Sequence, residues 1–145
     1  MLACIVLAAG HGPVRAADRF LKPEQAFRLE AVTSGTRVRL HWSIAPGYYL
    51  YRDRIAVGAE PPAAQAVALT LPAGERKDDP NFGPQQIFRH GLTVTVEAGA
   101  ARALHVRWQG CAEGGVCYLP QRQTVVLAGA GGLAADGPRP LKRAP

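Results

Sequence analysis

Residues 36–44, TRVRLHWSI, alternate strictly between polar and apolar side chains. This period of two is that of an extended strand with one buried face. The apolar side chains that would share this face are Val38, Leu40, Trp42 and Ile44. The same period recurs in five other segments, at 26–32, 67–71, 92–96, 104–108 and 124–128. Gly- and Pro-containing turns separate these segments, and no helical segments alternate with them. The sequence therefore predicts an all-β antiparallel sandwich.

Composition and charge narrow the class of protein. The chain has 145 residues, 48% of them hydrophobic and 19% charged, as in an ordinary globular domain. The formal net charge is +6, but the basic residues are dispersed and form no run of five or more. Because aromatic and basic residues do not alternate along any strand either, we do not expect nucleic acid as a partner.

The two ends of the chain differ from the middle. Residues 2–9 are apolar, and Val14 and Ala16 stand at the −3 and −1 positions of a cleavage site, so residues 1–16 resemble a secretory signal peptide. The alternative is a short buried strand. Residues 129–145 are rich in Gly, Ala and Pro without any period, and we expect a disordered tail or linker there. One domain is therefore predicted over 17–128, exported to the periplasm and either soluble or tethered through a lipid on Cys4.

Two of the three cysteines lie close together, in QGCAEGGVCYLP at residues 109–120. Removal of a signal peptide would leave only this pair, Cys111 and Cys117, in an oxidising compartment, where a disulfide is expected. Strand-like segments flank the pair, and the intervening loop contains two glycines. A β-hairpin that brings the two cysteines face to face is therefore predicted.

The residues alone leave three interpretations of this pair open. A structural disulfide closing so short a loop would stabilise the fold by only about 2 kcal/mol. A structural zinc site would need four ligands, and His90 and His105 are the available partners, with nothing that places either beside the thiols. A redox-active disulfide needs an accessible sulfur, which the glycine-lined loop provides.

Four motifs together resemble a known family. They are FLKPEQAF at 20–27, PGYYLYRDRI at 46–55, DDPNFGPQQIFR at 78–89 and QGCAEGGVCYLP at 109–120. In this order they are similar to the N-terminal periplasmic domain of the thiol:disulfide interchange protein family DsbD. The resemblance implies an immunoglobulin-like antiparallel β-sandwich with a small inserted β-subdomain that carries the active site.

The resemblance also assigns roles to residues. It implies that Cys111 and Cys117 form the catalytic disulfide, with Cys117 making the mixed disulfide and Cys111 resolving it. Residues 78–83 correspond to a cap loop over the pair, with Asp79, Phe82 and Gly83 among the candidate cap residues. Asn81 stands where the family carries the first of two aromatics.

The two tyrosines of the second motif complete the candidate site. Tyr49 and Tyr51 are two residues apart and so share one strand face, from which they could wall a pocket around the sulfurs. A different role, as ordinary sandwich aromatics, stays open for both, and a surface-loop role stays open for Phe82.

The function that the resemblance implies is protein-disulfide reduction without a cofactor or metal. Reducing equivalents would pass to periplasmic thioredoxin-like partners, namely disulfide isomerases and thioredoxin-like proteins of cytochrome c maturation. The chain would depend on a separate membrane electron donor of DsbD type. The rival hypothesis is a non-enzymatic immunoglobulin-like interaction module whose hairpin disulfide is structural.

Overall fold

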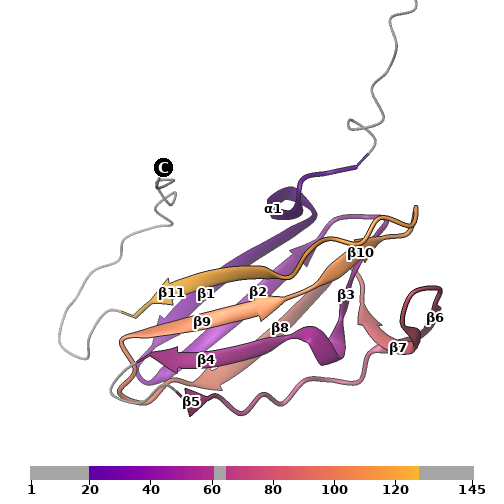
Figure 1. The fold of residues 1–145 in the computed structure, drawn as a ribbon. Coiled ribbons are helices and arrows are strands. Elements are labelled where there is room, and N and C mark those ends of the chain that lie inside the picture. Colours follow the sequence, from indigo (N-terminus) through magenta and orange to yellow (C-terminus); the bar gives the residue numbers. More distant parts are fainter. Residues whose placement is uncertain (1–19, 61–64, 128–145) are drawn as a thin grey trace, which may run out of the picture.

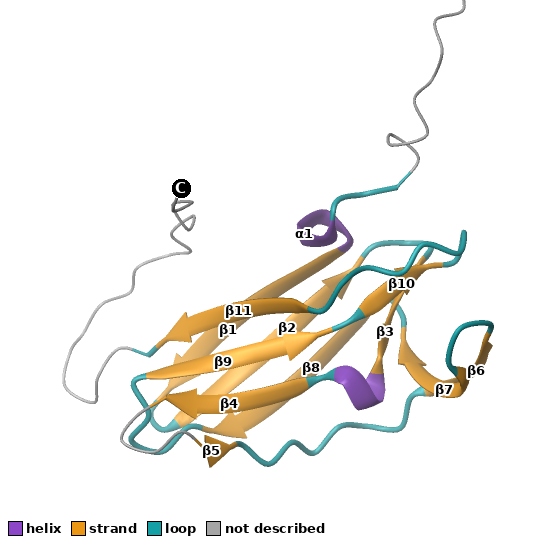
Figure 2. Cartoon of the chain, viewed as in Figure 1, coloured by secondary structure: helices purple, strands orange, loops and turns teal. Residues whose placement is uncertain are grey.

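The computed structural model describes residues 20–60 and 65–127. Two antiparallel sheets form the body of the molecule and lie one behind the other (Figures 1 and 2). The first sheet has the order β1-β2-β8, with β1 Phe27–Ser34, β2 Arg37–Ile44 and β8 Gly91–Glu97. The second has the order β11-β9-β4-β5, with β11 Gln121–Val126, β9 Ala103–Trp108, β4 Ala56–Glu60 and β5 Gln65–Ala66. This is the antiparallel sandwich that the strand pattern predicts, with the immunoglobulin-like architecture that the family resemblance implies.

A third, smaller sheet extends from one end of the sandwich (Figure 1). Its order is β10-β3-β7-β6, with β10 Gly110–Ala112, β3 Tyr48–Tyr51, β7 Gly83–Phe88 and β6 Glu75–Asp79. Helical structure among the described residues is limited to the single turns α1, Pro23–Ala26, and η2, Arg52–Arg54. The inserted β-subdomain that the family resemblance implies is this third sheet.

The apolar side chains of residues 36–44 point into the core between the two sheets, as the sequence predicts. All four are buried, and the facing sheet contributes Leu104, Val106 and Trp108. The rings of Trp42 and Trp108 meet edge to face, with centroids 6.1 Å apart. Aromatic pairs in this arrangement add stability beyond the burial of their area.

One predicted strand is wrong. Residues 67–71 are not in a strand; the short β5 ends at Ala66. The segment nevertheless packs Val67, Leu69 and Leu71 against the core, while the residues between them are exposed. The alternating pattern therefore predicted correctly which side chains are half-buried. A segment can bury one face in this way without pairing with neighbouring strands, so the pattern did not establish a strand. The predicted signal peptide, 1–16, and the predicted tail, 129–145, lie outside the described residues.

Candidate functional site

The two cysteines form a disulfide at β10, the edge strand of the third sheet. Cys111 lies on β10 opposite Tyr49 of β3, and Cys117 pairs back with it as an isolated antiparallel bridge. The predicted hairpin is thus confirmed. Its turn is closed by a hydrogen bond from the Ala112 N–H to the Val116 carbonyl, 2.7 Å.

The two sulfur-bearing residues differ sharply in exposure. Cys111 is completely buried, in a small cluster with Tyr49, Tyr51 and Ile87 that is separate from the sandwich core. Cys117 is exposed. A reactant from solvent therefore meets Cys117 first, while Cys111 is held behind it.

Close strand contact around Cys111 depends on the preceding glycine. A Cβ on Gly110 would meet the Tyr49 carbonyl oxygen and would come within 2.6 Å of the Phe27 ring. A side chain at this position would therefore push β10 away from β3. The glycine of QGC is thus a packing requirement, which the sequence motif alone did not explain.

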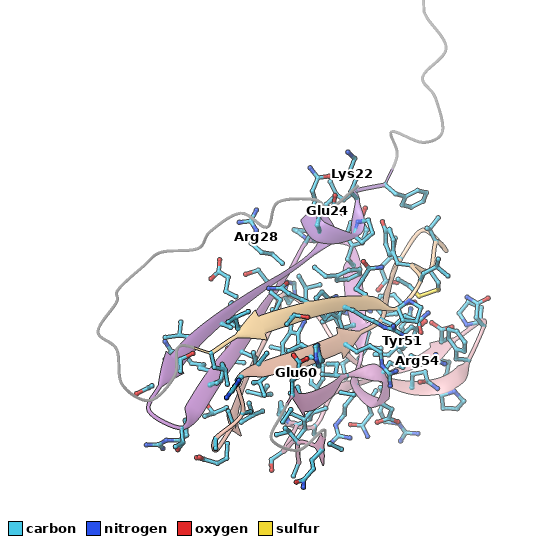
Figure 3. The ribbon with its side chains drawn as sticks, turned by 60° about the vertical axis from the view of Figure 1, so that its left-hand side comes forward. Lys22, Glu24, Arg28, Tyr51, Arg54 and Glu60 are labelled. Atoms are coloured by element: carbon cyan, nitrogen blue, oxygen red, sulfur yellow. A yellow bond between two sulfur atoms is a disulfide. The ribbon has the colours of Figure 1, made fainter. Side chains whose placement is uncertain are left out.

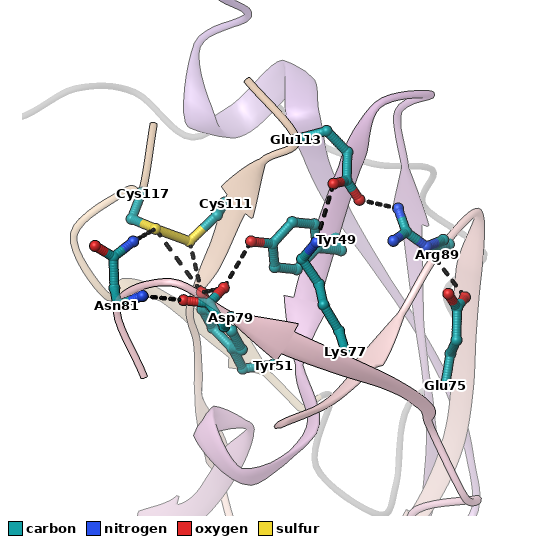
Figure 4. A network of polar contacts seen from close by, with 10 residues as sticks. All are labelled: Tyr49, Tyr51, Glu75, Lys77, Asp79, Asn81, Arg89, Cys111, Glu113 and Cys117. Atoms are coloured by element: carbon teal, nitrogen blue, oxygen red, sulfur yellow. Dashed lines mark hydrogen bonds and ion pairs between the residues drawn. A yellow bond between two sulfur atoms is a disulfide. The ribbon is translucent and has the colours of Figure 1, made fainter. Parts of the chain in front are cut away.

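A buried carboxylate organises the polar groups beside the disulfide (Figure 4). The hydroxyls of Tyr49 and Tyr51 donate to Asp79 Oδ2, at 2.8 and 2.6 Å. Asp79 Oδ1 accepts hydrogen bonds from the backbone N–H groups of Asn81, at 2.8 Å, and Phe82, at 3.2 Å. One side chain therefore binds both tyrosines of β3 and fixes the loop that follows β6.

These hydrogen bonds set the charge state of the three groups. Burial opposes ionisation of Asp79, but the bonds from Tyr51, the Asn81 N–H and Tyr49 outweigh it and lower the pKa of the carboxyl. Burial raises the pKa of Tyr49 to about 12, even though its contact with Tyr51 acts in the opposite direction. Burial and the bond to Asp79 also raise the pKa of Tyr51. At neutral pH the site therefore holds one carboxylate and two protonated tyrosines.

Tyr51 connects this carboxylate to the sulfurs. Its hydroxyl oxygen lies 3.0 Å from Cys111 Sγ and 3.8 Å from Cys117 Sγ. Because its proton is donated to Asp79, the oxygen presents a lone pair to the buried sulfur. Once the disulfide is reduced, this oxygen can accept a hydrogen bond from the Cys111 thiol.

The loop between β6 and β7 lies over the site, in the place predicted for the cap. Gly83 has φ of 70°, a left-handed conformation that favours glycine, and it turns the chain into β7. The Phe82 ring packs edge to face on Tyr51, with centroids 5.4 Å apart, and the Arg54 guanidinium lies 4.1 Å from the Phe82 centroid. Asn81 reaches the outer sulfur, with its side-chain amide 3.6 Å from Cys117 Sγ.

An ion-pair cluster ties the loop between the cysteines to the neighbouring strands. Glu113 accepts hydrogen bonds from Lys77, at 3.1 Å, and from Arg89, which also binds Glu75 at 3.1 Å. Burial acts against ionisation of Glu113, but the bonds from Arg89 and Lys77 outweigh it and lower the pKa of the carboxyl. The Glu113 side chain points toward these cations and away from the sulfurs (Figure 4).

The structure brings the candidate residues of the sequence analysis into one place. Tyr49, Tyr51, Asp79 and Cys111 are joined by direct contacts, and Phe82, a candidate cap residue, packs on Tyr51. Sequence reasoning missed Arg54, Lys77, Arg89 and the polar contact of Asn81. Each of these side chains contacts a residue of the site that is more than 20 positions away in the sequence, so no local sequence pattern could have predicted its involvement. His105, a candidate metal ligand, instead contacts Glu60 at 3.2 Å.

A family model for the N-terminal domain of the thiol:disulfide interchange protein DsbD matches residues 17–129. The chain belongs to the DsbD N-terminal family. DsbD 2 of Pseudomonas aeruginosa is 46% identical over 118 residues, which cover 80% of this chain and 19% of that protein. DsbD of Ralstonia nicotianae is 42% identical over 137 residues, covering 91% of this chain and 22% of that protein. The chain thus spans about a fifth of the length of these relatives.

Two solved structures of the DsbD family are similar to this one. The reduced DsbD N-terminal domain of Neisseria meningitidis has a TM-score of 0.70 and 33% identity, covering 81% of this chain and 96% of that one. The complex between the DsbD and PilB N-terminal domains of the same species has a TM-score of 0.63 and 31% identity, covering 78% and 91%. In the part of this chain that the structure describes, no helix is long and apolar enough to cross a membrane.

Proposed function

We propose that this domain exchanges disulfides with thioredoxin-like proteins in the periplasm, through the Cys111–Cys117 couple. The observation that carries the proposal is the asymmetry of the pair. The exposed Cys117 can be reached by a partner sulfur, and the buried Cys111 lies beside a tyrosine oxygen that can accept a hydrogen bond from its thiol. A disulfide whose only role was to close a short loop would not need this arrangement.

The proposed reaction starts from the reduced domain. The Cys117 thiolate attacks a partner disulfide, so that a Cys117–partner bond forms and the second partner sulfur leaves as a thiolate and takes up a proton. Cys111 then loses its proton and attacks Cys117 Sγ, which breaks the mixed disulfide and releases the first partner sulfur as a thiolate, which takes up the proton that Cys111 lost. Two electrons and two protons have passed to the partner, and the domain is left oxidised as in the structure.

The partners and the donor are part of the same proposal. The meningococcal relative is solved in complex with another protein domain, which supports proteins rather than small thiols as partners. Thioredoxin-like proteins, such as a disulfide isomerase or a cytochrome c maturation protein, are the class we propose. Reduction of the domain would require a separate membrane electron donor of DsbD type. We further propose that residues 1–16 direct export, that 17–128 form the mature domain and that 129–145 are a tail or linker.

A redox titration tests the proposal against the rival structural role. We expect the Cys111–Cys117 couple to have a midpoint potential above about −300 mV, because structural disulfides in secreted proteins lie below that value. The measurement is equilibration of the purified domain in glutathione or dithiothreitol buffers, followed by thiol alkylation and mass spectrometry. A midpoint well below this limit would support the interaction module with a structural disulfide.

We also propose that Phe82 holds the cap closed, and the Phe82→Ala variant tests this. The lost aromatic contact with Tyr51 is worth about 1 kcal/mol, which corresponds to an increase of about fivefold in the open cap. Reduction by dithiothreitol should accelerate by about that factor. Leu119→Ala is the matched control, since Leu119 is 82% exposed and lies near Cys117 outside the cap. Equal rates for Phe82→Ala and the wild type would remove this role from Phe82.

A further inference from the structure

A basic groove lies on the outer face of the second sheet, next to the segment that carries the disulfide. It has a volume of about 240 Å³, and three of its lining residues are arginines: Arg54, Arg107 and Arg122. Asp53 also lines the groove, but its carboxylate contacts Arg52, at 3.4 Å. The surface that the groove offers to a ligand is therefore strongly positive.

The arrangement of two of these arginines is unfavourable for the fold. Arg107 of β9 and Arg122 of β11 are direct partners in the antiparallel register, and both are exposed. Like charges directly opposite each other on a sheet are destabilising. Within residues 20–60 and 65–127, neither arginine forms an ion pair with a carboxylate, although His105 on the same sheet is paired with Glu60. An acidic group from outside would relieve this repulsion.

The groove is continuous with the redox site. Gln109 lines the groove and lies two residues before Cys111. Its side-chain amide donates to the carbonyl of Tyr118, the residue that follows Cys117, at 2.9 Å. Arg54 donates to Gln109 Oε1 at 2.8 Å, while its guanidinium also covers the Phe82 ring of the cap. Figure 3 shows Arg54 and Tyr51 at the same end of the molecule as the disulfide. A partner whose sulfur reaches Cys117 would therefore come close to Arg54, at this end of the groove.

We propose that the arginine groove, formed by Arg54, Arg107 and Arg122, binds an acidic segment of the redox partner. The proposal rests on the exchange function proposed above and specifies the kind of surface that a redox partner would present to this domain. Aspartate or glutamate side chains would pair with the guanidinium groups, which present planar donor sets suited to carboxylates. Charges at the rim of an interface act mainly on the association rate, so the groove would speed the encounter with acidic partners.

Matched cysteine peptides test the groove directly. One peptide carries four glutamates around a single cysteine, and the other carries four glutamines. Reduction of the Cys111–Cys117 disulfide by each is followed by acid quenching and mass spectrometry, and is normalised to the rate of the same peptide with a small neutral disulfide. At low salt we expect the acidic peptide to react about tenfold faster. The preference should vanish at about 0.5 M salt, where exposed charges are screened.

Two charge-matched double variants locate the effect. Arg107→Gln/Arg122→Gln should abolish the preference for the acidic peptide and leave the rate with dithiothreitol unchanged. Arg39→Gln/Arg102→Gln lowers the net charge equally at exposed sites, on β2 and in the turn before β9, and should retain the preference. Equal peptide rates in the wild type, or an equal loss of preference in both variants, would overturn the groove while leaving disulfide exchange intact. A disulfide that neither the peptides nor dithiothreitol reduced would overturn the exchange function and the groove together.

Discussion

Cys111→Ala will trap a covalent complex with a thioredoxin-like partner, whereas Cys117→Ala will trap little. The reason is the difference in exposure: the first variant keeps the exposed cysteine and lacks the resolving one, and the second keeps only the completely buried cysteine. Both variants should lose turnover entirely, because each lacks half of the couple. Non-reducing gels and mass spectrometry of the two variants, after incubation with the oxidised partner, would measure the trapped fraction.

Stability separates this prediction from the structural alternative. Loss of the disulfide should lower the free energy of unfolding by only about 2 kcal/mol, because the closed loop is short. The reduced wild-type domain is the matched control for both variants. Strong trapping through Cys111 would reverse the proposed roles. If neither variant trapped a partner and both unfolded, the disulfide would be structural.

Replacement of Asp79 by alanine should be among the most destabilising substitutions at the site. The carboxylate accepts hydrogen bonds from two buried tyrosine hydroxyls and two backbone N–H groups, and alanine leaves all four donors without it. Leaving buried polar groups unpaired costs 1–3 kcal/mol each, so we expect a loss of about 3 kcal/mol at pH 7 after partial relaxation. Denaturant unfolding of the oxidised domain would measure it. Asp78→Ala, at the exposed neighbouring position, is the control and should change stability by under about 0.5 kcal/mol.

The pH dependence gives Asp79 a second test. Because hydrogen bonding lowers the pKa of this carboxyl in the folded state, its ionisation stabilises the fold above the unfolded-state pKa of about 4. This contribution is lost as the pH falls through the lower folded-state pKa. The difference between wild type and Asp79→Ala should therefore be largest near neutral pH and shrink in acid. A difference that stayed constant down to about pH 2 would show that ionisation of Asp79 contributes nothing.

The sequence by itself determined the sandwich and the cysteine hairpin. Both are recorded in local patterns: the period of two that buries Val38, Leu40 and Trp42, and the glycine-containing loop between Cys111 and Cys117. The period of two also placed Tyr49 and Tyr51 on one face, since neighbouring side chains on a strand alternate. The same pattern misled at 67–71, because it reports half-burial and not strand pairing.

Only the tertiary structure decided what surrounds the sulfurs. The register of β10 on β3 buries Cys111, and the β6–β7 hairpin brings Asp79 to both tyrosines and Asn81 to Cys117. The pairing of β9 with β11 sets Arg107 against Arg122. These contacts join residues 15 to 62 positions apart, and their partners are chosen by strand order and register. The sequence thus identified the disulfide, and the fold determined which cysteine is exposed, which hydroxyl lies beside the buried one, and which charged groups surround the pair.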